Sequence, residues 1–413
     1  MSNRNFKIQA WAMWVPVVAF FMYQFVIRVS AGVMSDDIMQ RFSISATEFG
    51  ALTSVYYLGY ASMQMPVGLL LDRYGPKVVA TLFMALILCG IALFIYAPNW
   101  HVALIGRMLI GAGSAGGLLS TAKVARLWFD DHAYANVLGI TVSMGLIGAV
   151  YGSWPLRILI DQFGWENVLW ILLGFGGIIA LSIFTFVRVP PSEIIQDTPP
   201  KIWDEIKGIK NHLSIVKIGI LGGMIGPFLY AYADVWGVSY LSNIYGLSKA
   251  EASGCISAIY MGLCIGAPFT SYVVNKFDVG RKQTALYGFI KLFLLSALLF
   301  FKNIFNYDGV LIIHFLIGLA CSYQVILFVM VAKEVSVHEN AFVTSIVNMI
   351  NMLFGFMSIL IIGSVMDLNW TGVEEKGLRL YDETAYQIAF SLLIAGLLIG
   401  SLGMLKVKTE HEK

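Results

Sequence analysis

An arginine lies inside an almost wholly apolar stretch near the start of the chain. Residues 21–34 read FMYQFVIRVSAGVM, and Arg28 is their one charged residue. Its guanidinium keeps its proton, so it cannot become neutral in an apolar setting. The planar fork of N–H donors suits a carboxylate or a phosphate. The stretch therefore predicts that Arg28 binds an anion or pairs with an acid elsewhere in the chain.

Three roles are open to Arg28. Gln24 lies one helical turn before it and Gly32 one turn after it, so a helix here has one polar face with little bulk around the charge. An unpaired charge in an apolar setting costs on the order of 3 kcal/mol or more, so Arg28 needs a cavity or a partner. It can clamp an anion in a cavity, reach the end of its own segment and the acids there, or pair permanently with Asp234. We favour the cavity.

A single acid lies deep inside another apolar segment, FLYAYADVWGVSY. Asp234 follows Tyr230 by one helical turn, and Trp236 lies just beyond it. A carboxylic acid in a dry site can take up and release a proton near neutral pH, so Asp234 is our candidate for proton coupling. The alternative is that it stays ionised as the permanent counter-ion of Arg28. We expect the aromatic Tyr230 and Trp236 to shape a pocket around it.

The composition shows what kind of element must position these residues. Of 413 residues 58% are hydrophobic and 13% charged, against about 25% charged in soluble domains, and the mean hydropathy is +0.76. The first apolar run continues to about Val33 without a small-residue cleavage site, so we interpret it as a membrane span and not as a signal peptide. The chain is thus a polytopic membrane protein, and its spans are expected to be continuous helices. The predicted spans are 10–33, 47–70, 78–97, 102–125, 135–158, 166–187, 216–242, 250–274, 282–301, 309–332, 340–366 and 384–405.

The charges between the spans predict the orientation. With the N-terminus inside, eighteen of the 27 lysines and arginines lie on the cytoplasmic side, six on the other, and Arg28, Arg107 and Lys291 inside spans. Both termini are therefore expected to be cytoplasmic. The longest polar stretch, 188–215, separates an N-terminal six-helix bundle (1–187) from a C-terminal one (216–413). Its segment KIWDEIKGIKNHL is either a helix on the membrane surface or a plain linker.

Two short basic loops repeat at the same place in each half. GLLLDRYGPK, residues 68–77, joins spans two and three, and SYVVNKFDVGRK, residues 271–282, joins spans eight and nine. This pattern is typical of parallel repeats related by an axis along the membrane normal. The first loop matches G-x-L-x-D-R-x-G-x-K, and GRMLIGAGSAGG, which contains Arg107, matches R-x-x-x-G-x-G. With these motifs the chain resembles the major facilitator superfamily; RVSAGVM and LGYASMQMPVGLLLDRYGPK more narrowly resemble bacterial facilitators for amino acids and related nutrients.

The resemblance implies an all-α fold of two six-helix bundles related by pseudo-two-fold symmetry, with the substrate cavity between them. In this family spans one, four, seven and ten line that cavity. Polar stripes on spans two and eleven, which include Tyr57, Asn348 and Asn351, either line the pathway or form hydrogen bonds between helices. The candidate substrate-binding residues are Arg28, Gln24, Tyr57, Tyr230, Trp236, Tyr323 and Gln324.

The loop motif has a mechanical role in the family. Asp72 ends span two, where it can face the positive N-terminus of span eleven across the interface between the halves. Such contacts hold the cytoplasmic side shut, and breaking them lets the halves rock. Arg107 belongs to the second motif and either faces the pathway or braces span four. The candidate gating and motif residues are Gly68, Asp72, Arg73, Gly75, Lys77 and Arg107.

We therefore predict a secondary active transporter that imports a small carboxylate-bearing solute together with a proton. The solute would be an amino acid, a short peptide or an organic acid, and the protein a monomer in the inner membrane of a bacterium. The four cysteines form no CxxC pattern, and no enzyme motif such as HExxH or GxSxG occurs, so we expect no metal, cofactor, nucleic acid or catalysis.

Two alternatives stay open. One is an exporter of drugs or siderophores by proton antiport, although helix five lacks the glycine-proline pair usual in drug exporters. The other is a transporter-like sensor that binds a solute without moving it.

Overall fold

The computed structural model describes residues 3–188, 213–277, 280–335, 340–375 and 377–407. Among these residues, 11 helices are long and apolar enough to cross a membrane. One of them, α3 (Ala46–Ile95), contains both the second and the third predicted span, joined at Gly75, whose φ of 75° and ψ of 164° interrupt the helix. With α3 counted as two spans, the twelve crossings predicted from the sequence are confirmed.

The first six crossings follow the predicted spans closely. Their elements are α1 (Asn3–Val33), the short α2 (Ser35–Phe42), α3, α4 (Trp100–Ser114), α5 (Gly116–Trp128), α6 (Asp131–Tyr151), α7 (Trp154–Phe163) and α8 (Trp165–Phe186). The predicted linker 188–215, with its possible surface helix, lies almost wholly outside the described residues.

The second six crossings begin within α10. Their elements are α10 (Leu213–Ile225), the π-helix η2 (Phe228–Trp236), α11 (Gly237–Tyr245), α12 (Lys249–Lys276), α13 (Arg281–Phe300), the 3₁₀ turn η3 (Lys302–Ile304), α14 (Tyr307–Cys321), α15 (Tyr323–Lys333), α16 (Asn340–Leu368) and α17 (Glu383–Lys406). A two-residue antiparallel pair, β1 (Glu374–Glu375) and β2 (Leu378–Arg379), precedes α17 and was not predicted.

The prediction of continuous helices is wrong for spans four, five, seven and ten. Each is broken near its middle, and span seven most strongly, because a π-helix stands between α10 and α11. Pro227 precedes this π-helix and has no N–H to donate to the preceding turn, which favours a break there. An interruption of the α-helix at membrane depth is tolerated where it is buried in protein, and every residue of η2 is buried.

The second helix of each half begins with the same local signal. Ser45 accepts a hydrogen bond from the Glu48 N–H, and the Glu48 carboxylate accepts one from the Ser45 N–H. Ser248 and Glu251 repeat this capping box at the start of α12. The repeated box marks equivalent positions in the two halves, as expected for a fold with internal pseudo-symmetry.

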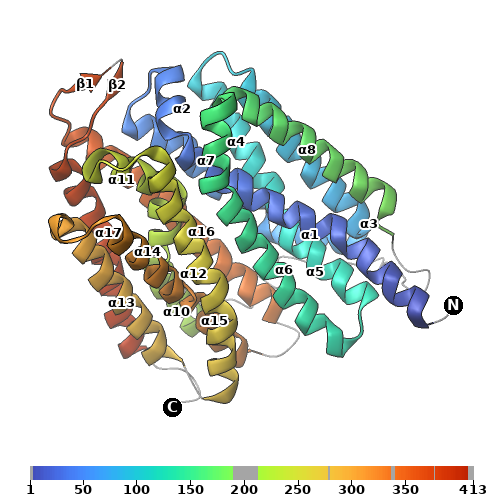
Figure 1. The fold of residues 1–413 in the computed structure, drawn as a ribbon. Helices are drawn as coiled ribbons and strands as arrows, with labels where there is room; N and C mark the ends of the chain where they lie inside the picture. The colour runs from blue at the N-terminus through green and yellow to red at the C-terminus, as the bar shows by residue number, and fades with distance from the viewer. Residues whose placement is uncertain (1–2, 189–212, 278–279, 336–339, 376, 408–413) are drawn as a thin grey trace.

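The chain forms two helical bundles that lie side by side in Figure 1, the first in blue to green and the second in yellow to red. In the first bundle α1 packs against α5, α6 and α8, and in the second α10 packs against α16 and α17. The bundles meet where α3 contacts α16, where α12 contacts α6 and α7, and where α1 contacts η2. The residues of greatest interest therefore lie at the seam, on α1, α3 and η2.

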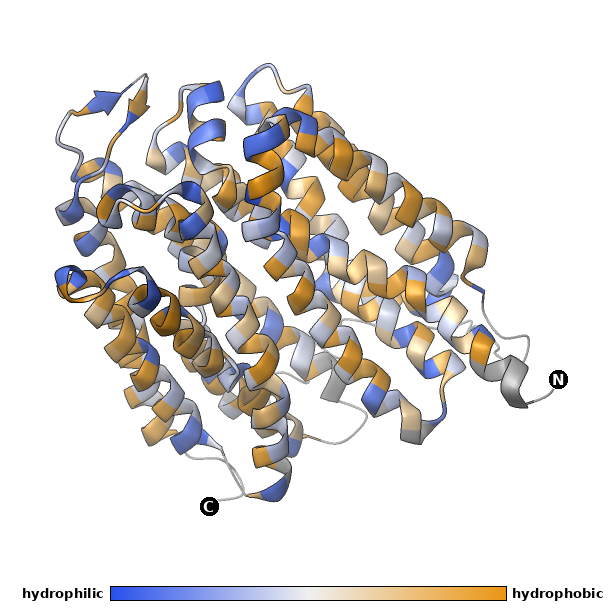
Figure 2. Ribbon diagram, in the orientation of Figure 1, coloured by the Kyte–Doolittle hydropathy of each residue, from blue (hydrophilic) through white to orange (hydrophobic). Residues whose placement is uncertain are grey.

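The outer surface of the bundles is apolar along the helices. Figure 2 shows hydrophobic residues along the lengths of the helices, with hydrophilic ones gathered toward their ends. Large apolar side chains such as Phe184, Phe293 and Leu402 are exposed. A surface of this kind is stable against lipid and not against water, in agreement with the composition.

Candidate functional site

Arg28 and Asp234 form an ion pair between the two bundles. The Arg28 Nε lies 3.1 Å from the Asp234 Oδ2, with α1 supplying the arginine and η2 the aspartate. Both side chains are buried, 7% and 1% exposed. Asp36 and Asp37, the acids just after α1, pair instead with Lys249 at 3.1 Å and Arg157 at 3.3 Å. Of the partners considered from the sequence, the structure thus places Asp234 beside Arg28.

Two tyrosines complete the surroundings of Asp234. The Tyr57 hydroxyl on α3 donates to its Oδ2, and the Tyr260 hydroxyl on α12 donates to its Oδ1. Arg28 and Tyr57 belong to the first bundle and Tyr260 to the second, so this acid connects both halves. Tyr260 was missed from the sequence, although it stands at the same offset from Ser248 as Tyr57 does from Ser45. That repeated offset from the capping boxes could have identified it.

The Arg28 guanidinium has capacity for a further ligand. Its Nε is buried, and the contact with Asp234 is an ion pair without a well-aligned hydrogen bond. The two terminal nitrogens donate no hydrogen bond to any residue that the structure describes. Unlike the Nε, they are not fully buried. The guanidinium carbon lies 4.5 Å from the Phe25 ring centroid and 6.0 Å from that of Tyr230. The fork therefore retains two donors of the kind that bind a planar anion.

The side chains of Gln24 on α1 and Arg107 on α4 meet Tyr56 of α3 inside the first bundle. The Tyr56 hydroxyl donates to the Gln24 Oε1 over 3.0 Å, and the Arg107 guanidinium lies 5.3 Å from the centroid of the Tyr56 ring. One terminal nitrogen of Arg107 donates to the Ile27 carbonyl over 3.3 Å, and its Nε is buried without a partner. Arg107 thus contacts the backbone of α1 one residue before Arg28. It holds the helix that carries the central arginine.

The buried charges do not balance. In the described spans Arg28, Arg107 and Lys291 are buried, while Asp234 is the one buried acid. Arg157, also buried, is paired with Asp37 and Asp161 near the end of α7. The core of the protein therefore carries an excess of positive charge, which favours a bound anion.

Tyr230 and Gln324 join the central group, whereas Tyr323 and Trp236 have other partners. The Tyr230 hydroxyl accepts a hydrogen bond from the Gln324 Nε2 over 3.1 Å, and its ring centroid lies 5.4 Å from that of Tyr57. The Tyr323 hydroxyl donates to the Gly222 carbonyl over 3.0 Å. Trp236 packs edge-on against Phe49 at 5.3 Å, between α3 and α16. Its indole seals the seam between the bundles.

Polar residues of α16 continue the seam. The Asn348 amide donates to the Gln64 Oε1 on α3 over 3.2 Å. Asn351 is buried, and both polar atoms of its amide have no hydrogen-bond partner among the described residues. One turn further on, a Cβ at Gly355 would lie 3.1 Å from the Tyr230 ring. Asn351 thus lies between the Gln64 contact and Tyr230, on the face that meets the other elements of the site.

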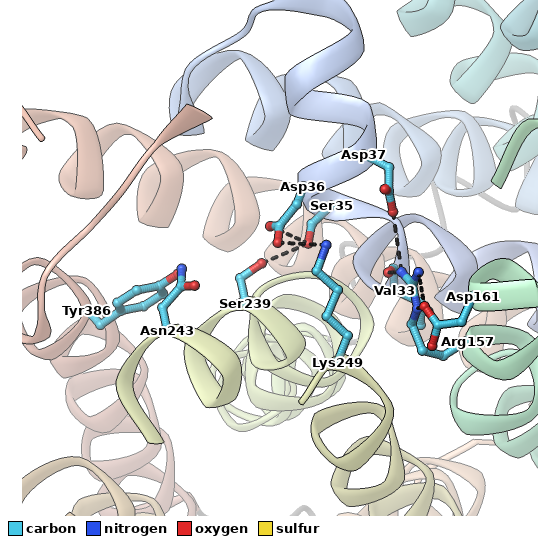
Figure 3. Close-up of polar contacts among 10 residues, drawn as sticks. All are labelled: Val33, Ser35, Asp36, Asp37, Arg157, Asp161, Ser239, Asn243, Lys249 and Tyr386. Carbon is cyan, nitrogen blue, oxygen red and sulfur yellow. Dashed lines mark hydrogen bonds and ion pairs between the residues drawn. The ribbon is translucent and has the colours of Figure 1, made fainter. Parts of the chain in front are cut away.

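Cross-bundle contacts close the side of the protein opposite the two termini. Ser35 and Ser239 share a hydrogen bond of 2.8 Å, and Lys249 reaches Asp36 beside them (Figure 3). The backbones come close as well, because a Cβ at Gly32 would lie 2.4 Å from the Asp234 carbonyl oxygen. This side is therefore sealed by both side chains and backbone.

Asp367 adds a second contact on the same side. Its carboxylate accepts hydrogen bonds from the N–H groups of Ala46 (3.3 Å) and Thr47 (2.8 Å), at the positive N-terminus of α3. Tyr381 donates to the same carboxylate. Burial, and next this hydrogen bond to Asp367, raise the pKa of the Tyr381 hydroxyl, so it remains a donor. A helix end of one bundle is thus held by an acid of the other.

The loop motif makes contacts within the first bundle. Asp72 pairs with Lys123 of α5 at 3.0 Å, Arg73 lies over the Tyr74 ring at 5.2 Å, and Lys77 lies over the Phe184 ring at 4.8 Å. Gly75 takes the positive φ that the turn requires, while a Cβ at Gly68 would meet nothing within 4 Å. The contact of Asp72 with the start of span eleven stays a prediction, because residues 336–339 lie outside the described part of the chain.

Comparisons with known proteins agree with this architecture. A family model described as Major Facilitator Superfamily matches residues 17–359. The chain is 27% identical over 279 residues to the hexuronate transporter of Bacillus subtilis (strain 168), covering 63% of this chain and 65% of that protein. It is 30% identical over 279 residues to the D-galactonate transporter of Escherichia coli O6:H1, covering 61% and 64%. The matches thus span just under two thirds of these two relatives.

A solved structure shows the same fold over nearly the whole chain. It is that of a bacterial homolog to the human lysosomal transporter Spinster in an inward-facing and unoccupied conformation, with a TM-score of 0.78 at 15% identity. The match covers 97% of this chain and 98% of that one.

Proposed function

The chain belongs to the major facilitator superfamily, so it is a membrane transporter and not an enzyme, and we propose that it carries a small carboxylate together with a proton by alternating access. Arg28 binds the carboxylate, and Asp234 carries the proton. The two bundles, 1–187 and 216–413 with the linker 188–215 between them, rock about this site. As parts of the same proposal, both termini are cytoplasmic, and the protein works as a monomer in a bacterial inner membrane.

The observation that carries this proposal is the state of Arg28. It is a buried cation that is shared with one acid of the other bundle and retains two unused terminal nitrogens. The excess of buried positive charge in the described spans makes an anion the favourable ligand. A neutral or cationic solute would leave that charge uncompensated.

Coupling follows from competition for Arg28. A substrate carboxylate that binds the guanidinium displaces Asp234, which then remains buried without its cation. A buried carboxylate without a counter-ion is expensive, so it takes up a proton and becomes neutral. One anion and one proton thus enter together, while Tyr57 and Tyr260 keep the protonated acid in place.

The empty carrier can return because the pair is then restored. With no substrate present, Asp234 releases its proton and again neutralises Arg28, so the empty site buries no additional charge. The contacts of Ser35, Asp36 and Asp367 close the side away from the termini. If the termini are cytoplasmic, this conformation is closed to the outside.

Within the carboxylates, the site favours a polyhydroxy acid over an amino acid. An amino acid also brings an ammonium group, and the buried cations of the described spans already outnumber Asp234, their one buried acid. Tyr230, Gln324 and Asn351 instead offer donors and acceptors for hydroxyl groups. The relatives named for hexuronate and D-galactonate support this choice.

Uptake into proteoliposomes tests the proposal. We expect the purified protein to accumulate labelled D-galactonate when the outside is acidic, and expect excess hexuronate, but not neutral galactose or an amino acid, to compete. Equal competition by galactose would rule out the carboxylate clamp. Depletion of preloaded acid by an inward proton gradient would indicate an exporter, and binding without counterflow would indicate a sensor.

A further inference from the structure

Lys291 is a buried cation that the transport cycle described above does not use. It lies on α13, is 1% exposed, and has no acidic partner among the described residues. Its ammonium donates a hydrogen bond of 3.0 Å to the Ile225 carbonyl and lies 4.1 Å from the centroid of the Tyr323 ring. A leucine or methionine would fill the same space at a lower cost of burial, so the charge requires an explanation.

The carbonyl that Lys291 contacts is the last one of α10. In a continuous helix the Leu229 N–H would bond the Ile225 carbonyl, but here it donates to Gly226 over 2.9 Å. Pro227, between them, has no N–H to offer. The end of α10 therefore exposes carbonyl groups and the negative end of a helix dipole inside the membrane. An ammonium group matches both requirements.

Tyr323 supports the same helix end from another side. Its hydroxyl donates to the Gly222 carbonyl over 3.0 Å, one turn before the break, while its ring faces the Lys291 ammonium. Residues of spans nine and ten thus hold both the last turn and the last residue of α10. The carbonyl groups at the break in span seven are thus bound by side chains of two neighbouring spans.

The π-helix that follows this break carries the coupling acid. Both Tyr230 and Asp234 belong to η2, which begins three residues after Ile225. The rotation and height of a short helix are set by its first turn, so the position of Ile225 sets where the Asp234 carboxylate points. We propose that Lys291 is a positioning residue, whose bond to the Ile225 carbonyl holds η2 in the register that brings Asp234 to Arg28. This rests on the proposed function only for its consequence in transport.

A double-mutant cycle tests the proposal without any substrate. The thermal unfolding of the purified protein is measured for Lys291→Met, Asp234→Asn and the double variant. If Lys291 places Asp234 against Arg28, the ion pair is already lost in Lys291→Met, and Asp234→Asn then lowers Tm by less than about half of its effect in the native background. Additive shifts would overturn the proposal, because a merely structural lysine does not couple to a distant acid.

Two further variants complete the design. Lys291→Arg retains a cation that can reach the carbonyl and stack on Tyr323, so it should restore most of the Tm and of the coupling. Lys282→Met, an exposed lysine on the same helix, is the matched control and should change neither. Where Lys291→Met does not fold, Lys291→Gln replaces it in the cycle, with the same criterion of non-additivity.

A transport measurement then links the position of Asp234 to function. Because Lys291→Met leaves Arg28 without its acid, we expect it to lower the KM for D-galactonate exchange about tenfold in the native background and less than about twofold in the Asp234→Asn background, where the acid is already absent. Absence of D-galactonate uptake by the native protein would count against the proposed substrate. The additivity of the Tm shifts would then decide whether Lys291 is a positioning residue. A KM change of the same size in both backgrounds would contradict the positioning role.

Discussion

Replacement of Asp234 by asparagine separates its two proposed roles. The substitution keeps the size of the side chain and one acceptor oxygen for the tyrosines, but it removes the negative charge that neutralises Arg28. Breaking a buried ion pair by removing one partner costs about 3–5 kcal/mol. Since the terminal nitrogens of Arg28 retain some access to solvent, we expect the lower end, about 3 kcal/mol of the free energy of unfolding.

The same loss should improve substrate binding. In the native protein a carboxylate has to displace Asp234 from Arg28, whereas in Asp234→Asn the guanidinium is vacant. If displacement costs about 3 kcal/mol, the affinity for D-galactonate at pH 7 rises by up to roughly 100-fold, because each 1.4 kcal/mol is a factor of ten. Native binding takes up a proton and therefore strengthens as the pH falls, whereas binding by the variant should not depend on pH between 5.5 and 7.5.

Calorimetric titration of the purified protein at several pH values measures both effects. Uphill uptake into proteoliposomes should be lost in Asp234→Asn, while exchange of internal for external D-galactonate is retained. Asp36→Asn, which alters a pair at the rim, serves as the control and should keep the pH dependence. Weaker binding by Asp234→Asn, or binding that still strengthens as the pH falls, would refute the competition for Arg28.

Three further predictions concern the anion clamp, the hydroxyl contacts and the closed seam. Arg28→Gln should remain folded, because Asp234 then takes up a proton and becomes neutral, yet show no thermal stabilisation by D-galactonate; normal uptake would exclude Arg28 as the ligand of the carboxylate. Asn351→Leu should weaken binding of D-galactonate about tenfold while leaving a hexanoate competitor unaffected, and equal losses for both acids would contradict hydroxyl recognition. Gly363→Leu should prevent closure of the seam, because a Cβ there would lie 2.3 Å from the Ala46 carbonyl oxygen. An impermeant maleimide should then label a Ser239→Cys reporter more strongly. Unchanged labelling would contradict this prediction.

The number and order of the crossings could be predicted from the sequence because they depend on local properties. A run of apolar residues must be helical in lipid, whichever helices surround it, since its own backbone has to satisfy its polar groups. Breaks within the runs were harder to foresee. Pro227 indicates one, but the groups that bind the carbonyls at the end of α10, the ammonium of Lys291 and the hydroxyl of Tyr323, come from other spans.

Arg28 and Asp234 were conspicuous in the sequence for the same local reason, namely the cost of a charge in an apolar segment. Their pairing was one of several possibilities, and only the packing of α1 against η2 selected it, with Gly32 allowing the close approach. The sequence does not distinguish Tyr260 from other buried tyrosines, because a tyrosine in an apolar helix is compatible with many environments. Its role depends on the position of α12.

The sequence by itself determined that this chain is a twelve-span membrane protein of a known transporter family, with two charged residues that need an explanation. The tertiary structure decided which residues meet at the seam of the bundles: Asp234 bound by Arg28 and two tyrosines, Trp236 against Phe49, and Asp367 at the start of α3. The physical reason is range. Hydrophobic periodicity and burial costs act within one helix, whereas a contact between residues more than 170 positions apart depends on how whole helices pack.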